Sequence, residues 1–558
     1  MWLLIGAVCA GLAMAHGDDE SMDISASDSQ DAHGDGPMSY FAYGQHSGTI
    51  VAHIALMVLA WCFVLPAAVL LSVGRSRLAL PSQFLFLVLT AIGLLFGIVY
   101  DSQTPNLYEN NAHHKIGWIV TWVFSAQVVL ALIFAYAGRG EIQQAESAVG
   151  SESFNRVRFL PLATNEHECL YTDRASHDHE SGPSTPSRAS QTEFDGFEKP
   201  EEFHPKPSGL RVWYYNSSVH RILSKRVPGL VSTRALRILN GIYNIIDRII
   251  LPFGFIAIAT GAITYGGLFH GIEVFNGVAH FIKGGIFFWY GILTLGRFIG
   301  AWADLGWAWN KKPPAAVVGW KAKVPSGEFV ESFVIWLYGV TNVFLEHLSG
   351  WGGEWTAADL QHVSISVMFF GGGLVGMLVE SRRVREVLNH TLLQSQSPSS
   401  DSEYDSHSGG DEIWQPPTSQ KVPLNPMPAL VILLLGMMMG SHHQDSMTSS
   451  MVHKQWGNLL VGFALSRGMT YFLLFLRPPT SYLPSRPPTE IVAGFCLIAG
   501  GLIFMLSARD VILAMEFYSL DAMFTFTVGM GFTAFIMALV VLAIALKAWA
   551  VRRERRWN

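Results

Sequence analysis

The sequence predicts an all-α protein, a polytopic bundle of about eleven transmembrane helices that follow a signal peptide. Three observations predict this class. Half of the 558 residues are hydrophobic, only 14 % are charged, and the mean hydropathy is +0.30, which is not the composition of a soluble globular chain. The apolar residues gather in runs of about 18 to 25, long enough to cross the hydrocarbon core as a helix. Lys and Arg gather in alternate loops between these runs.

The first fifteen residues predict a cleaved signal peptide rather than a membrane span. Their short apolar core ends at Ala13-Met14-Ala15, which is a typical small-x-small cleavage site. Residues 16–48 then form an acidic, serine-rich tail. We therefore expect the mature N-terminus to be extracytoplasmic, in an integral membrane protein of the secretory pathway, in the endoplasmic reticulum, the vacuole or the plasma membrane.

Eleven apolar runs follow the tail. They are 49–73, 81–100, 114–137, 246–267, 276–302, 329–347, 361–380, 426–440, 454–476, 488–507 and 523–548. The run at 426–440 is the shortest. The runs divide into a three-span domain (49–137) and an eight-span domain (246–548), which are joined by a polar linker (138–245). A basic tail (549–558) ends the chain.

The distribution of basic residues predicts the orientation. Lys and Arg occur in the loops 138–245, 303–328 and 381–425 and in the C-terminal tail, and none occurs in the loops 101–112, 268–275, 348–360 and 441–452. Because basic loops stay in the cytoplasm, the C-terminus is predicted to be cytoplasmic. The net charge of −6 indicates no nucleic-acid partner, so the expected partner is the lipid bilayer. The four scattered cysteines show no disulfide or metal spacing.

Ten of the twenty histidines lie at the predicted extracytoplasmic ends of the spans. They are His53, His113, His114, His270, His280, His347, His362, His442, His443 and His453. A one-sided ring of imidazoles suggests haem or metal held near one leaflet. A histidine at a helix end is also a common interfacial residue, because it combines an apolar body with a polar tip.

Four of these histidines form two predicted pairs. His53 and His113 start the first and third spans, and His362 and His453 start the seventh and ninth. Spans separated by one helix run in the same direction, so each pair lies at one depth and can supply both axial ligands of a b-type haem. The recurrence also suggests that spans one to three and spans seven to nine are repeats of one unit. The glycine one turn beyond His113 or His453 would let a macrocycle or a neighbouring helix approach.

Three further histidines are predicted metal ligands. His280 has Lys283 and Gly284 one turn later inside the membrane, and His442 and His443 follow three consecutive methionines, a combination that suits Cu(I).

No catalytic residue is identified, and the sequence shows no paired membrane carboxylates. Arg297 and Asp304 are interpreted as marks of a cytoplasmic helix end, and the tryptophans that follow as an aromatic belt.

Two family resemblances add to this picture. The stretch from Ala52 to Trp61, closing in Leu65-Pro66, and the His113-x-x-x-Gly117 sequence resemble the transmembrane cytochromes b-561. The whole chain resembles the fungal YTP family, in which a short N-terminal membrane domain precedes a longer one. The first resemblance implies a b-561-like core with haem b, and the second implies a fold and a membrane location. Two-haem cytochromes carry a second histidine pair where spans 81–100 and 246–267 have none.

The leading hypothesis is therefore a protein that binds one or two haem b groups through His53/His113 and His362/His453. It would carry out one-electron chemistry or redox sensing at the extracytoplasmic face. Two alternatives stay open. One is an ion or metal transporter that uses the histidine ring, and the other is a non-catalytic membrane scaffold that works through its cytoplasmic loops. The sequence does not decide whether the protein is an enzyme.

Overall fold

All regular secondary structure that the computed structural model describes is helical. The described residues are 39–148, 233–271, 273–345, 354–394, 422–441 and 444–556. The predicted signal peptide, most of the acidic tail and most of the linker lie outside them. The chain divides into two compact units, one of residues 1–128 and 245–558 and one of residues 129–244.

The first span is one continuous helix with a local π-helical turn. After the short α2 (Tyr40–Tyr43), α3 (Ser47–Val58), η1 (Leu59–Val64) and α4 (Leu65–Val73) follow without a break. Pro66 causes the π turn, because it has no N–H to give and its ring crowds the carbonyl four residues back. The Leu65 N–H accordingly donates to the carbonyl of Ala60, five residues earlier.

Three more long helices complete what we call the N-terminal group. They are α5 (Ala79–Gln103), α6 (Ala112–Ala148) and α9 (Thr233–Gly266), and they pack with α3 and α4 in the first unit. Apolar faces of these helices meet in a core of aromatic rings. The ring centroid of Phe86 lies 4.9 Å from that of Trp61 and 4.3 Å from that of Phe124, in edge-to-face contacts. Such contacts add to the burial of large apolar surface.

The predicted linker is helical at both ends. α6 continues to Ala148 and α9 begins at Thr233, well inside the range 138–245 that the polar composition assigned to a linker. In the second unit, the rings of Phe134 and Tyr243 are in edge-to-face contact at 5.9 Å.

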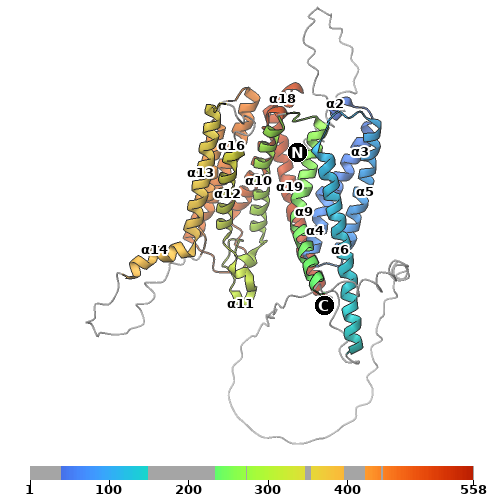
Figure 1. The fold of residues 1–558 in the computed structure, drawn as a ribbon. Helices are drawn as coiled ribbons and strands as arrows, with labels where there is room; N and C mark the ends of the chain where they lie inside the picture. Colours follow the sequence, from blue (N-terminus) through green and yellow to red (C-terminus); the bar gives the residue numbers. More distant parts are fainter. Residues whose placement is uncertain are drawn as a thin grey trace, which may run out of the picture. The chain divides into compact units, whose positions relative to one another are not determined.

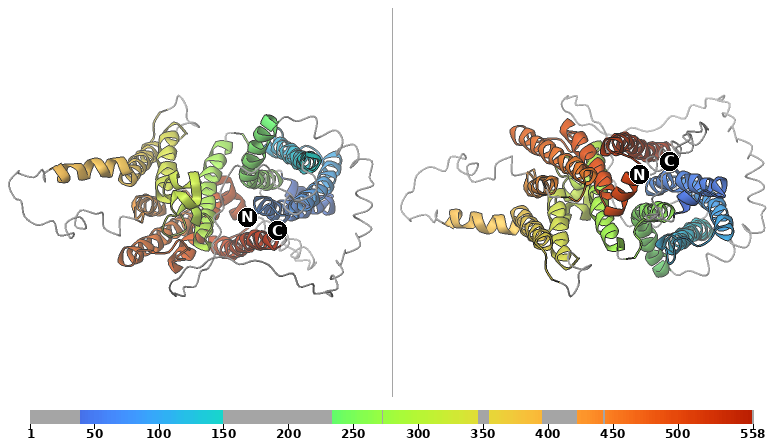
Figure 2. Two further views of the ribbon diagram at one scale, coloured as in Figure 1. Left: turned by 90° about the horizontal axis from the view of Figure 1, so that it is seen from below. Right: turned by 90° about the horizontal axis from the view of Figure 1, so that it is seen from above.

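The remaining long helices form the C-terminal group. They are α10 (Glu273–Ile299), α12 (Gly327–Leu345), α13 (Ala357–Glu380), α15 (Met427–Gly440), α16 (Met447–Leu476), α17 (Pro488–Leu506) and α19 (Ala522–Arg555). Those labelled in Figure 1, which are α10, α12, α13, α16 and α19, run upright there. α17 is the most buried of the long apolar helices and packs against α10, α16 and α19. α19 also packs against α4 of the N-terminal group (Figure 2).

Glycines bring α10 and α17 into backbone contact. A Cβ atom on Gly284 would lie 2.6 Å from the carbonyl oxygen of Gly501, and a Cβ on Gly501 would lie 2.5 Å from the carbonyl oxygen of Gly284. Only a residue without a side chain fits at either position. In a membrane, where lipid is as apolar as leucine, such close packing is a main source of helix association.

Short helices occupy the connections. At the end of the helices that carries the basic loops, called the basic end here, lie η2 (Ala303–Leu305), α11 (Ala315–Val318), η3 (Gly319–Lys323) and α14 (Arg382–Gln394). α14 turns away from the axis of α13 in Figure 1. α18 (Arg509–Phe517) lies in the connection between α17 and α19, at the opposite end. We call that opposite end the histidine end.

The predicted fold class is confirmed: the protein is a polytopic, all-helical integral membrane protein. Among the described residues, nine helices are long and apolar enough to cross a bilayer, and they match nine of the eleven predicted runs. The other two runs form α12 and α15, which are 19 and 14 residues long. α18 was not predicted, because its nine residues include charged side chains and form no apolar run.

Candidate functional site

The structure brings the first predicted pair together. His53 lies on α3 and His113 on α6, and both side chains are half-buried at the histidine end. Their ring centroids are 6.4 Å apart, and the ring planes are inclined at 80°. Two imidazoles from different helices therefore face one region of the N-terminal group.

Backbone carbonyls on the other two helices fix the tautomer of both rings. The Nδ1 atom of His53 lies 2.8 Å from the carbonyl oxygen of Gly93 on α5, and that of His113 lies 3.0 Å from the carbonyl oxygen of Ala257 on α9. A carbonyl can only accept, so each Nδ1 carries the hydrogen and each Nε2 keeps its lone pair. This is the state in which histidine binds metals, with the other nitrogen donating to a second-shell acceptor.

A glycine one turn beyond each acceptor carbonyl makes room for the ring. A Cβ atom on Gly97 would lie 2.8 Å from the Nδ1 of His53, and a Cβ on Gly261 would lie 2.9 Å from the Cε1 of His113. Each ring thus occupies the space where the glycine has no side chain. α5 therefore positions the His53 ring, and α9 positions the His113 ring.

Two further histidines of the ring lie in or beside the connections at the histidine end. The ring of His270 lies 4.3 Å from that of Tyr108 between centroids, inclined at 31°, and the Tyr108 hydroxyl donates to the carbonyl of Leu268 at 2.7 Å. Burial and the nearby Asp510 carboxylate raise the pKa of Tyr108, so its hydroxyl stays a donor. His114 is exposed beside His113.

The second predicted pair has a different environment. The Nδ1 of His453, on α16, bonds to the Ser449 carbonyl of its own helix at 2.8 Å. His280, on α10, lies close enough to His453 and to His362 of α13 to interact electrostatically with both. Three helices therefore contribute histidines here. Direct pairing of His362 with His453 stays a prediction.

The glycine beyond His453 faces a helix. A Cβ atom on Gly457 would lie 2.6 Å from the carbonyl oxygen of Gly436 on α15. The glycine spacing at this position thus serves close packing of α15 on α16 rather than the approach of a macrocycle.

The predicted copper site cannot be placed in full. His442 and His443 lie outside the described residues, as does His347. Within the described part of the chain, no three His, Cys, Asp or Glu side chains converge as a metal site. The Nδ1 of His280 is bonded to the Asn276 carbonyl of its own helix at 2.9 Å, and its assignment as a metal ligand stays a prediction.

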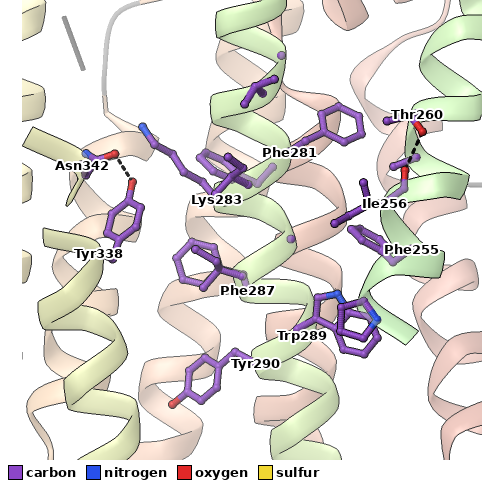
Figure 3. Close-up of a pocket in the computed structure, with 18 of the residues that line it drawn as sticks. Phe255, Ile256, Thr260, Phe281, Lys283, Phe287, Trp289, Tyr290, Tyr338 and Asn342 are labelled. Atoms are coloured by element: carbon purple, nitrogen blue, oxygen red, sulfur yellow. Dashed lines mark hydrogen bonds between the residues drawn. The ribbon is translucent and has the colours of Figure 1, made fainter. Parts of the chain in front are cut away.

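A cavity of about 1090 Å³ lies along α10, on the sides that point toward α9 and toward α12. Lys283, Phe287 and Tyr290 point from α10 toward α12, whereas Phe281 and Trp289 point toward α9 (Figure 3). The residues of α10 that line it run from Val274 to Leu293, a rise of about 28 Å at ~1.5 Å per residue. That rise is close to the thickness of the hydrocarbon core. The walls are mostly apolar, with His362 and Glu331 among the few polar lining residues.

Five charged side chains form a buried ion cluster at the basic end of this cavity. They are Arg297 of α10, Glu328 and Glu331 of α12, Arg467 of α16 and Glu490 of α17, and none is more than 6 % exposed. Arg297 bonds Glu328 at 2.7 Å and Glu331 at 2.5 Å. Arg467 bonds Glu331 at 3.1 Å and Glu490 at 2.8 Å. Glu331 therefore bridges the two arginines.

The ion cluster corrects two sequence-based interpretations. Arg297 does lie in the last turn of α10, as expected of a residue that marks a helix end, but paired membrane carboxylates are present and one of the tryptophans that follow has another role. The segment after α10 folds back, so that the Trp309 ring lies 4.2 Å from the Arg297 guanidinium and 4.9 Å from that of Arg467. This tryptophan is buried between two cations and does not belong to an interfacial belt.

The sequence holds two signals for this cluster. Glu328 and Glu331 are three residues apart and so share one face of a helix, and Arg467 interrupts a predicted span. A similar polar contact lies in the N-terminal group, where Asp247 of α9 accepts hydrogen bonds from Ser72 and Gln127. An ionisable residue within a span indicates a functional site by default.

The fold and these buried polar groups define a polytopic integral membrane protein with separate polar sites toward its two ends. The chain belongs to the YTP1-like family: residues 253–548 match the family described as "Protein YTP1-like, C-terminal". Residues 35–137 match a domain of unknown function, DUF2427. The expected membership of the YTP family is thereby confirmed.

The similar proteins are fungal membrane proteins. An uncharacterized membrane protein of Schizosaccharomyces pombe is 33 % identical over 531 residues, which cover 93 % of this chain and 98 % of the relative. An uncharacterized membrane protein of Saccharomyces cerevisiae is 37 % identical over 57 % of this chain and 49 % of its own length. Protein YTP1 of the same yeast is 23 % identical over 51 % of this chain and 50 % of its own. No solved structure matches.

Proposed function

We propose that the N-terminal group binds one b-type haem between His53 and His113 and takes part in one-electron transfer or redox sensing at the histidine end. The separation of the two rings carries the proposal. A metal bound by both Nε2 atoms, each about 2 Å away, would place the ring centroids roughly 6 Å apart. The observed separation is 6.4 Å, which supports a bis-histidine donor set.

The chain would supply ligation and a controlled environment. Haem b, when bound, provides a reversible one-electron step. The carbonyls of Gly93 and Ala257 hold both imidazoles in the ligating tautomer and raise the basicity of Nε2. Toward the basic end, the aromatic core that contains Trp61 and Phe86 keeps the surroundings apolar, which favours a site of low dielectric.

The proposal is limited to one haem. α5 and α9 contain no histidine, so the N-terminal group offers a single axial pair. At the second predicted pair, His453 bonds its own helix and α15 covers Gly457. With one site near one end of the spans, the proposed chemistry is confined to the histidine end.

An absorbance spectrum of the purified, haem-replete protein tests the proposal. We expect a sharp reduced α-band of the b type after dithionite. His113→Ala and His53→Ala should each abolish it, because one axial ligand is lost. His114→Ala is the matched control, since this exposed neighbour contributes no ring to the pair and should leave the spectrum unchanged.

The same preparation separates the alternatives. If no Soret or α-band forms in the wild type, or if both His53→Ala and His113→Ala keep it, the haem proposal is wrong. Metal found without a haem spectrum would favour the transport alternative, which the cavity along α10 and the nearby His280 and His362 support.

A further inference from the structure

We infer that the ion cluster is a proton-binding site that holds one exchangeable proton, carried by Glu328 or by Glu490. This inference concerns the C-terminal group and does not rest on the haem proposal. It follows from the number of buried charges, from two carboxylate oxygens that accept nothing, and from the position of the cluster at the cavity.

The charges of the ion cluster do not balance. Two guanidinium groups, of Arg297 and Arg467, face three carboxyl groups, and arginine stays protonated in proteins. With all three carboxyls ionised, the cluster would carry one uncompensated negative charge at sites that are almost fully buried. A buried, uncompensated carboxylate takes up a proton instead.

The hydrogen bonds indicate which carboxyl groups have an oxygen available to carry the proton. Glu331 uses both oxygens, one for each arginine, so neither of them is free to carry a hydrogen. Glu328 and Glu490 each bind an arginine through Oε1 only. Their Oε2 atoms are buried and have no hydrogen-bond partner within the described part of the chain. A protonated carboxyl would carry its hydrogen on such an oxygen.

Other titratable groups around the cluster come from four elements. They are Tyr290 of α10, Glu380 of α13 and Tyr471 of α16, together with the carboxyls of α12. The hydroxyl of Tyr471 is buried without a partner within the described residues and lies close enough to Glu328 to interact electrostatically. Glu380 is half-buried, accepts from Ser326 at 2.8 Å and interacts with Arg385. It is a competing carboxyl that interacts electrostatically with Glu331.

The cluster is connected to the cavity through Glu331 and Tyr290, which line it. Tyr290 also lies within hydrogen-bond distance of Arg467, at 3.4 Å. Binding or release of the proton changes the charge of Glu328, which binds Arg297, or of Glu490, which binds Arg467. The protonation state therefore controls the ion pairs that close the basic end of the cavity. The step itself is the addition of a proton to a carboxylate, with no change of redox state.

Infrared spectroscopy of the purified full-length protein tests this site. Wild type at neutral pH should show a carbonyl band of a protonated carboxyl group that shifts in D₂O. Glu328→Gln and Glu490→Gln should each remove the band, because two carboxylates then balance two arginines. Glu273→Gln, at the far end of α10 and only loosely paired with Arg509 at 3.5 Å, is the control that should keep it.

Two outcomes overturn the inference: no such band in the wild type at any pH at which it is folded, or a band that survives both substitutions. Loss of the band in Glu380→Gln alone would assign the proton to α13 and also overturn it. Thermal unfolding gives a second readout. Glu328→Gln and Glu490→Gln should melt close to the wild type, whereas Glu331→Gln should melt lower because both arginines lose their shared carboxylate. If a variant does not fold, the pH titration of the wild-type band remains decisive.

Discussion

At the level of single residues, four histidines differ in which helix provides the carbonyl that accepts a hydrogen bond from Nδ1. His53 and His113 donate to carbonyls of neighbouring helices, whereas His280 and His453 donate to carbonyls one turn back on their own helices. A bond across an interface fixes the ring relative to two helices at once. His53 and His113 each link two helices in this way, and their two rings also lie next to each other.

The close contacts of these rings with Gly97 and Gly261 give a direct prediction. Gly261→Ala would place a Cβ atom 2.9 Å from the Cε1 of His113, so the ring must move and its bond to Ala257 must weaken. We expect a loss of about 1–3 kcal/mol in the free energy of unfolding, as for other overpacked sites. Thermal or denaturant unfolding in detergent measures it.

Gly117→Ala is the control for this prediction. No atom lies within 4 Å of the position of its Cβ, so the change should be neutral or should stabilise α6 by up to about 1 kcal/mol. Equal destabilisation by the two substitutions would contradict the seating of His113 on Gly261.

Sequence reasoning could reach the His53–His113 pair and could have found members of the ion cluster, but it could not reach the contacts between those members, and the reason is physical. The depth of a residue in the membrane follows from its position in an apolar run, so two histidines at one level are predictable. Contacts between Arg467 and Glu331, or between Trp309 and both arginines, depend on how a connection folds back across several helices. No local pattern records that path. The Nδ1 partners of the histidines are unpredictable for the same reason.

At the level of elements, the helices follow the apolar runs closely and their packing follows the small residues. The predicted run 488–507 is α17, which ends at Leu506, and the run 361–380 ends with α13 at Glu380. Helix bounds outside the apolar runs are less predictable, because polar turns extend a helix beyond the hydrocarbon at either end. α16 begins at Met447, capped by Ser446, seven residues before the predicted run.

The contact between α10 and α17 predicts opposite effects for two neighbouring glycines. Gly284→Ala would place a Cβ atom 2.6 Å from the carbonyl oxygen of Gly501, and backbone cannot give way as a side chain can. Gly285→Ala meets only the ring of Phe255, at 3.6 Å, which is ordinary contact. We expect Gly284→Ala to destabilise the fold by about 1–3 kcal/mol and Gly285→Ala to leave it unchanged or to raise its stability slightly. Parallel thermal melts compare the two, and a reversed order would mean that α10 does not pack on α17 through this face.

At the level of the whole molecule, the buried polar groups are separated along the helix axes. The histidine pair lies at the end whose connecting segments carry a single basic residue, Arg509, whereas the ion cluster lies at the end where Lys and Arg gather. The two proposed activities would therefore act on opposite faces of the membrane. That conclusion depends on the orientation, which the charge distribution predicts.

Cysteine labelling tests the orientation in sealed microsomes, whose outer face is cytoplasmic. In a variant without native cysteines, Val317→Cys in α11 should react with a membrane-impermeant maleimide before permeabilisation, because Val317 is 73 % exposed at the basic end. Ser441→Cys, at the exposed C-cap of α15, should react only after detergent opens the vesicles. A lumenal marker protein reports whether the vesicles are sealed. The reverse pattern would place the histidine pair in the cytoplasm, where an electron donor for the proposed haem would have to be sought on the same side as cytosolic reductants.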